Sequence, residues 1–169
     1  MALFAALLCV SSYISIPLPF SPVVLTLQTL VVNLIALILP PKKAVLTVVV
    51  WVLLGTAGLP VFSGGVGGPA KLFGPTGGYI VGFVAAVWLI SLLKGTQIKF
   101  WRWLLVTVCI GISVIYVVGV PWMMAVTGIG FGAAVTTSVL PFLPGDVLKC
   151  VAAAVIASQL LPALRMEGA

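Results

Sequence analysis

The sequence predicts an all-α integral membrane protein, and three observations carry this prediction. Of the 169 residues, 63% are hydrophobic and only 6% are charged, whereas soluble globular domains usually contain about 25% charged residues. The mean hydropathy is +1.38. The apolar residues also form continuous runs and lack the alternating pattern of a transmembrane barrel. Because backbone amides in lipid must be hydrogen-bonded internally, such runs should form helices.

The lengths of the apolar runs predict one transmembrane domain over residues 1–169, with no separate soluble domain. A spanning helix needs about 20 apolar residues, so five or six helices fit between the loops. We predict six spans, at residues 2–16, 23–39, 44–58, 76–93, 103–120 and 146–161. Residues 17–22 should form a stiff, proline-rich turn. The stretch after Pro121 is apolar but broken by Gly and Pro, which fits half a span or short interfacial helices.

The basic residues are expected to orient these spans. With six spans, six of the eight Lys and Arg residues share one side of the membrane, Lys71 lies on the other side, and Lys149 lies within the last span. The six are Lys42, Lys43, Lys94, Lys99, Arg102 and Arg165. This asymmetry follows the positive-inside rule and places both termini in the cytoplasm. A five-span arrangement remains open and would place Arg165 outside.

Composition argues against nucleic acid and metal ions as ligands. The net charge is +6, but the basic residues lie at the ends of apolar runs and form no aromatic-rich patch of the kind that binds nucleic acid. Cys9, Cys109 and Cys150 are unclustered and each lies within an apolar run, so we interpret them as packing residues. With no His and two acidic residues, a side-chain metal site is not expected. No cofactor is predicted.

The segment PFLPGDVLK contains the clearest candidate site. Asp146 and Lys149 are three residues apart, so they share one face of a helix. They are the only opposite charges close together in a predicted span, and ionisable residues in such places are costly and usually functional. The pair would offer an acceptor and a donor to a small ligand that has both N–H groups and a carbonyl or carboxylate. Alternatively, Asp146 caps the helix and Lys149 neutralises it.

A second candidate is the Gly-rich segment at residues 58–79, which the topology places outside the cell between the third and fourth spans. Glycine permits positive φ and close backbone approach, and apolar residues such as Phe62 interrupt the glycines. This pattern suits a lid over an apolar ligand, with Gly65, Gly68 and the closing Tyr79 as candidate ligand contacts. A merely flexible loop is the alternative. A phosphate loop is excluded because its Gly-Lys-Ser/Thr ending is absent.

Weaker signals lie in the first two spans. Gln28 is an amide near the external end of the second span, at the level of the expected pocket, and Asn33 lies on another face of the same span. The alternative role for such amides is an interhelical hydrogen bond worth about 1 kcal/mol. Ala2 and Ala6 have the small-xxx-small spacing that lets helices approach closely.

Three segments together resemble the BioY family: SIPLPFSPVVLTLQT, GLPVFSGGVGGPAKLFGPTGGYIVGF and PFLPGDVLK. The resemblance covers nearly the whole chain, in the right order. It implies a biotin-specific substrate-capture (S) subunit of an energy-coupling-factor (ECF) transporter in the cell membrane, with six transmembrane helices and both termini inside. Biotin would bind near the external side, under the loop between the first two spans or between the third and fourth.

The resemblance also implies partners: a transmembrane coupling protein and two cytoplasmic ATPases. The small-residue motif that docks the coupling protein in this family matches Ala2 and Ala6. The ureido ring of biotin has two N–H groups and one carbonyl. Asp146 would accept from an N–H, and Lys149 would donate to the carbonyl or, alternatively, to the carboxylate of the tail. An apolar pocket with a few placed polar groups is typical of small-ligand sites.

Three other functions compete with this interpretation. An S subunit for another vitamin would have the same architecture. A membrane enzyme would need catalytic groups, and one Asp and one Lys are the only candidates. A selective channel should repeat polar residues along its spans, whereas this chain has one charged pair near one end. No ATPase motif occurs, so we expect a transport subunit that is not an enzyme.

Overall fold

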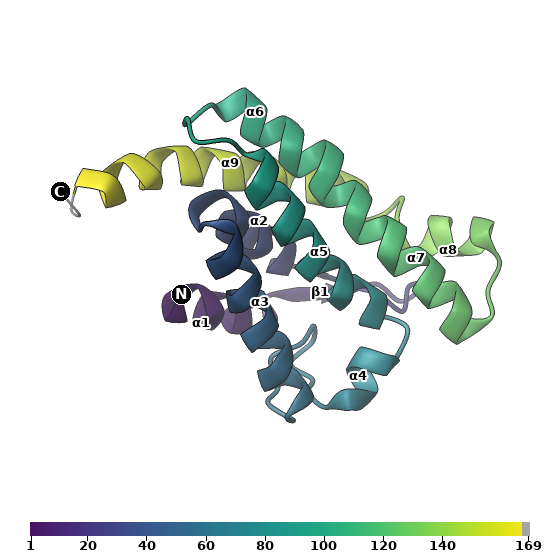
Figure 1. Ribbon diagram of the computed structural model, residues 1–169. Helices are drawn as coiled ribbons and strands as arrows, with labels where there is room; N and C mark the ends of the chain where they lie inside the picture. The colour runs from purple at the N-terminus through teal and green to yellow at the C-terminus, as the bar shows by residue number, and fades with distance from the viewer. Residues whose placement is uncertain (167–169) are drawn as a thin grey trace.

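Helices form most of the protein, whose computed structural model describes residues 1–166 (Figure 1). The main helical segments are α1 (Ala2–Ser11), α2 (Gln28–Ile38), α3 (Pro41–Thr56), α5 (Gly77–Leu93), the continuous segment Phe100–Thr127 and α9 (Leu143–Met166). Each overlaps one predicted span. By length and apolarity, two segments in the described part of the chain could cross a membrane, namely Phe100–Thr127 and Leu143–Ala163. The 10 residues of α1 and 11 of α2 are short of the usual span.

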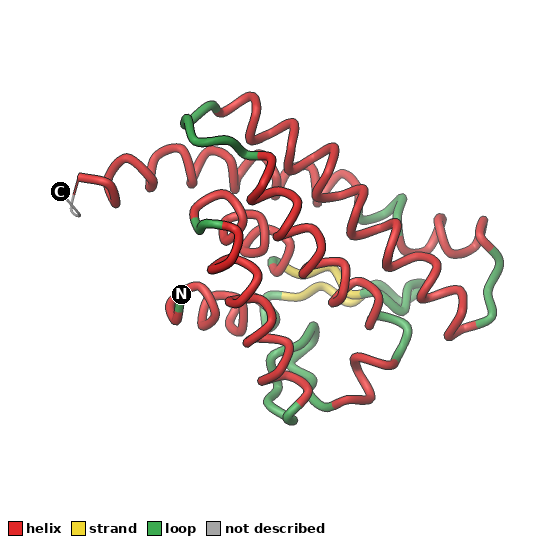
Figure 2. The backbone as a smooth tube through the Cα atoms, viewed as in Figure 1, coloured by secondary structure: helices red, strands yellow, loops and turns green. Residues whose placement is uncertain are grey.

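A β-hairpin separates α1 from α2, and here the predicted span ends were wrong. Strand β1 (Ser15–Pro17) pairs antiparallel with β2 (Val24–Thr26), with Ile16 opposite Leu25 (Figure 2). The first helix therefore stops before residue 16 and the second starts after residue 23. The prolines between the strands provide no N–H for a helix, and the β-branched residues that flank them favour extended backbone. The predicted turn at residues 17–22 joins the two strands.

The Gly-rich segment is more ordered than a flexible loop would be. It contains the short helix α4 (Pro69–Phe73) and a β-bridge between Phe62 and Val66. Positive φ angles occur at Gly58, Gly64, Gly65 and Gly68, as the glycine content predicts. The chain thus makes several tight turns here before it enters α5.

The segment Phe100–Thr127 continues past the predicted end at residue 120. It consists of α6 (Phe100–Leu105), a π-helical stretch η1 (Val106–Ile112) and α7 (Ser113–Thr127), with Pro121 inside α7. Proline is tolerated in membrane helices because neighbouring groups satisfy the freed carbonyl. The helix ends where Gly128 adopts a left-handed conformation, φ 73°. A second short helix, α8 (Phe131–Ser138), completes the stretch that the sequence left open.

Glycines let α5 and α7 pack closely against each other. A Cβ atom added at Gly78 would clash with Trp122, one added at Gly119 would clash with the ring of Tyr79, and one added at Gly82 would lie 3.1 Å from the Cα of Ile115. Small residues at helix contacts are the usual means of close packing in membranes. This close approach places the Tyr79 ring between the two helices.

The outer surface is strongly apolar. Leu3, Val117 and Leu148 are each 70% or 71% exposed, and Trp101 is 72% exposed. In contrast, Trp51, Trp103 and other large side chains are fully buried. An apolar exterior around a close-packed interior is what a lipid environment favours, because exposed apolar patches of this extent are rare on soluble monomers.

Asn33 packs between helices, away from the face that carries Gln28. Its Nδ2 donates to Cys150 Sγ of α9 at 3.4 Å, and its Oδ1 is buried without a hydrogen-bond partner among the described residues. The interhelical role that the sequence left open for this amide is therefore the one that the structure shows. Cys150 is fully buried and acts as a packing residue there.

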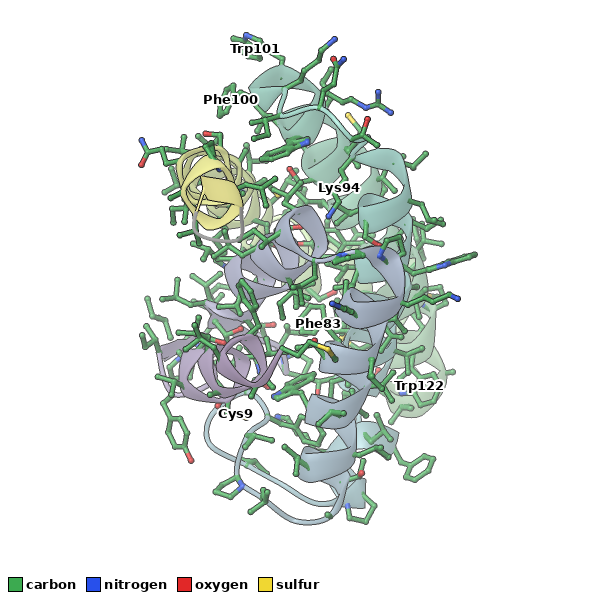
Figure 3. All side chains as sticks on the ribbon, turned by 60° about the vertical axis from the view of Figure 1, so that its left-hand side comes forward. Cys9, Phe83, Lys94, Phe100, Trp101 and Trp122 are labelled. Atoms are coloured by element: carbon green, nitrogen blue, oxygen red, sulfur yellow. The ribbon has the colours of Figure 1, made fainter. Side chains whose placement is uncertain are left out.

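Lys94, directly after α5, bonds to the end of α2. Its Nζ donates to the carbonyls of Ala36 and Leu37 at 2.9 Å each and also to that of Leu39. These carbonyls end α2 and lack helical partners of their own. Figure 3 shows Lys94 toward the same end of the molecule as Trp101.

We predict that Lys94→Met lowers the free energy of unfolding by about 2 kcal/mol, because three partly buried carbonyls lose a charged donor. Thermal unfolding in detergent measures this change. Lys99→Met is the matched control. Because Lys99 is exposed, this variant should unfold at the same temperature as the wild type. Equal melting temperatures for both variants would show that Lys94 does not hold the end of α2.

Candidate functional site

An interior cavity lies where the β-hairpin meets α2, α5, α7 and α9. Its wall includes hairpin residues 23–26, Gln28 and Thr29 of α2, Ile80 and Phe83 of α5, and Tyr116 of α7. About 60 Å³ of it is open to water-sized molecules, which is room for a few waters. Most of the lining surface is apolar, and polar side chains from several elements take part in it. This is the usual composition of a small-ligand site.

Asp146 and Lys149 form a buried ion pair in this wall. Lys149 Nζ lies 3.0 Å from Asp146 Oδ1. Lys149 is only 8% exposed and Asp146 only 9%. Both belong to α9, whose first turn contains Asp146. The predicted placement of the pair on one helical face is thus confirmed. A buried pair is costly to desolvate and persists only when further hydrogen bonds satisfy its atoms.

Two hydroxyl groups from other helices complete this pair. Thr29 Oγ1 donates to Asp146 Oδ1 at 3.1 Å and accepts from Lys149 Nζ at 3.1 Å. Tyr116 OH donates to Asp146 Oδ2 at 2.7 Å. We call Thr29, Tyr116, Asp146 and Lys149 the polar cluster. It joins α2, α7 and α9 at a single point.

The helix-capping role considered for Asp146 is not what the structure shows. The hydrogen bonds that the carboxylate accepts within residues 1–166 come from the side chains of Thr29, Tyr116 and Lys149, and none comes from the backbone. Asp146 is itself inside the helix, because its N–H bonds to the carbonyl of Phe142 at 2.9 Å. Its carboxylate therefore faces across to other helices.

The polar cluster keeps hydrogen-bonding capacity for a ligand. A lysine ammonium has three donors, and Lys149 uses two of them, to Thr29 and Asp146. A carboxylate has about four acceptor positions, and Asp146 uses three. Within the described residues, one donor of Lys149 and one acceptor position of Asp146, on Oδ2, thus have no partner.

Tyr79 also lines the cavity, as the sequence predicted for the end of the Gly-rich segment. Its OH donates to Ser138 Oγ of α8 at 2.8 Å, and its ring meets the Tyr116 ring edge-on, with centroids 6.3 Å apart. The two tyrosines together form an aromatic wall next to the polar cluster.

Gln28 lines the cavity and also fixes the Gly-rich segment. Its Nε2 donates to the carbonyl of Val61 at 3.5 Å, and Trp51 Nε1 donates to the same carbonyl at 3.0 Å. Its Oε1 accepts from Thr26 Oγ1 of the hairpin at 3.2 Å. Gln28 therefore connects both segments that cover the cavity.

Phe62, Gly65 and Gly68 lie outside the cavity lining. The ring of Phe62 is fully buried against Trp51, with centroids 5.1 Å apart, in space that a Cβ on Gly55 would fill. It anchors the loop. Gly65 packs beside Tyr13, and the loop residue that does line the cavity is Ser63.

Sequence reasoning did not select Thr29, Tyr116 and Ser138 as site residues. Thr29 and Ser138 are single hydroxyl groups in apolar helices, and Ser and Thr hydroxyls commonly bond to their own helix. Tyr116 is an aromatic residue in an apolar run, where packing or an interfacial position is the more common role. The signal that could have found Thr29 is its place directly after Gln28 in TLQT. For metal binding, no group of three or more His, Cys, Asp or Glu side chains gathers within the described residues.

Known proteins similar to this chain are biotin transporters. The chain is 40% identical over 159 residues to the probable biotin transporter BioY of Pyrococcus horikoshii, covering 94% of this chain and 92% of that one. It is 40% identical to the biotin transporter BioY of Thermotoga maritima, covering 94% and 91%. It is 36% identical to the probable biotin transporter BioY of Bacillus subtilis, covering 98% and 90%.

A solved structure has the same fold. It is the crystal structure described as the S-component for biotin from an ECF-type ABC transporter, and it matches with a TM-score of 0.87 and 28% identity. The match covers 94% of this chain and 87% of that one. The model of the BioY family matches residues 1–166. The resemblance that the three sequence segments suggested is thereby confirmed, and the chain belongs to the BioY family.

Proposed function

We propose that this protein binds biotin as the S component of an ECF-type transporter in the cell membrane, and that the ligand occupies the cavity beside the polar cluster. Similar proteins are named as biotin transporters, and the similar solved structure is described as an S-component for biotin. The observation that carries the proposal is that one donor of Lys149 and one acceptor position of Asp146 have no partner within the described residues, in a mostly apolar pocket. A ureido ring has a carbonyl and N–H groups, which complement such a donor and such an acceptor.

The remaining lining suits the rest of biotin. Val23, Leu25, Phe83 and Ile115 provide apolar contact for the thioether ring and the aliphatic tail. A ring N–H group that found no acceptor in this cavity would weaken binding, because its desolvation would not be compensated. The polar cluster therefore gives specificity as well as affinity.

The helices fit a six-span arrangement with both termini in the cytoplasm. The spans would be α1, α2, α3, α5, the segment Phe100–Thr127 and α9. Lys42, Lys94 and Lys99 begin or end helices at one end of the bundle, and Lys71 lies in α4 at the other (Figure 1). This arrangement satisfies the positive-inside rule. The short helices α1 and α2 are extended across the membrane by the hairpin between them.

We further propose that a transmembrane coupling protein and two cytoplasmic ATPases act with this subunit. An S component supplies the substrate site, so energy must come from partners. Ala2 and Ala6 are both exposed on α1, and no segment in the described range covers them. Their small side chains would let a partner helix approach α1 closely.

One prediction of the proposed function concerns the charged pair. Asp146→Asn or Lys149→Met should weaken biotin binding more than tenfold, because each removes one ligand bond and leaves a buried charge unpaired. Calorimetry in detergent measures binding, with thiamine and riboflavin as other ligands and Lys71→Met as a variant outside the cavity. Normal biotin binding by both folded variants would show that the pair is only structural. Equal binding of thiamine would contradict biotin specificity.

A second prediction concerns Tyr116. Tyr116→Phe removes one donor to Asp146 at nearly constant volume, so biotin affinity should fall by roughly tenfold, the equivalent of one hydrogen bond to a charged group. Tyr13→Phe removes an exposed hydroxyl and should bind as the wild type does. Isothermal titration of both proteins gives the comparison. If Tyr116→Phe keeps full affinity, the carboxylate does not need this donor to bind the ligand.

A third prediction separates docking from binding. Replacing both Ala2 and Ala6 with Leu should leave biotin affinity unchanged but reduce biotin uptake by cells that also produce the coupling protein and ATPases. Ala133→Leu, at an exposed alanine of α8, is the matched control. Loss of biotin binding in the double variant, or unchanged uptake, would argue against a docking role.

A further inference from the structure

Helices α3 and α5 pack side by side (Figure 1). Two adjoining hollows lie on the surface that these helices form. Both include Val45 and Trp88, so they form one groove. We call it the α3/α5 groove. The hollow nearer the start of α3 adds Lys42, Leu46 and Val49, and the other adds Val81, Val84 and Ala85. None of these residues lines the cavity beside the polar cluster.

The α3/α5 groove is apolar along its length and positive at one end. Its wall is made of aliphatic side chains and the half-exposed indole of Trp88. Lys42 is exposed in the first turn of α3, where no acidic residue occurs. Within residues 1–166 the only carboxylate side chain is that of Asp146, and it pairs with Lys149. The charge of Lys42 is therefore not neutralised by that part of the chain.

The groove is short enough to lie within one leaflet of a bilayer. Its two hollows are shallow and open to the outside. Val81 lies seven residues from Trp88, or about 10 Å along α5. One leaflet contributes about 15 Å of hydrocarbon.

We propose that the α3/α5 groove binds one anionic phospholipid of the inner leaflet. Its phosphate contacts Lys42, and one acyl chain lies along Val45, Val84 and Trp88. The ligand is chosen by charge complementarity: Lys42, at the mouth of an apolar groove, matches an amphiphile with a negative head. The neighbouring Lys43 is also exposed and adds positive charge at this end of α3. The site depends on the proposed orientation, which puts the start of α3 at the cytoplasmic headgroups, but not on biotin binding.

Native mass spectrometry tests this site. The whole protein is titrated in detergent with phosphatidylglycerol and with phosphatidylcholine that has the same acyl chains. We expect phosphatidylglycerol to bind about fivefold more tightly, as one lysine near the headgroup would give. Lys42→Met should remove this preference, and Lys99→Met, at an exposed lysine outside the groove, should keep it. Ala85→Phe fills the groove from its surface and should weaken binding of both lipids.

Three outcomes would overturn the lipid site: equal binding of the two lipids by the wild type, an equal loss of preference in Lys42→Met and Lys99→Met, or unchanged binding in Ala85→Phe. The second outcome would mean that diffuse positive charge attracts lipid without a defined site. Biotin binding is measured on the same variants and should stay at the wild-type value. Failure of the lipid site therefore leaves the proposed function untouched, and loss of biotin binding in the wild type would concern only that function.

Discussion

The buried ion pair of Asp146 and Lys149 constrains the rest of this structure. Two charges in an apolar interior are stable only when every polar atom near them finds a partner. Thr29 and Tyr116 supply those partners from α2 and α7, so three helices must meet at one point. Within the described residues, one donor of Lys149 and one acceptor position of Asp146 still have no partner. The cluster that holds three helices together is thus also the one that we propose for ligand recognition.

Close packing around this cluster determines how the cavity is covered. Gly78 and Gly119 allow α5 and α7 to approach, which positions Tyr79 beside Tyr116. On the opposite side, the Val61 carbonyl accepts from both Gln28 and Trp51, so part of the Gly-rich segment is firmly attached. The outer surface of the bundle has a different composition. There, apolar side chains face lipid, and isolated charges such as Lys42 lie where the helices end.

The helices themselves could largely be predicted, because apolar runs in lipid have few alternatives to helix. The errors occurred at run ends. Residues near 16 and 24 are apolar and β-branched, a composition that suits strand as well as helix, and only pairing with each other selects the hairpin. The fifth span was expected to end at residue 120, just before Pro121, yet α7 continues through this proline. A proline leaves one helix carbonyl without its N–H donor, but neighbouring groups can bond to that carbonyl. The local sequence therefore overstates how strongly such a proline ends a helix.

For the site, the sequence by itself determined the ionisable pair, since two opposite charges three residues apart in an apolar helix must face the same way. It also determined Gln28 and Tyr79 as candidates, because polar groups are rare in these spans. Only the tertiary structure decided that Thr29 and Tyr116 bond to the pair, that Phe62 is an anchor, and that the hairpin lines the cavity. Those contacts join residues far apart in the chain, as the 117 positions between Thr29 and Asp146 illustrate, and no local pattern encodes such a distance.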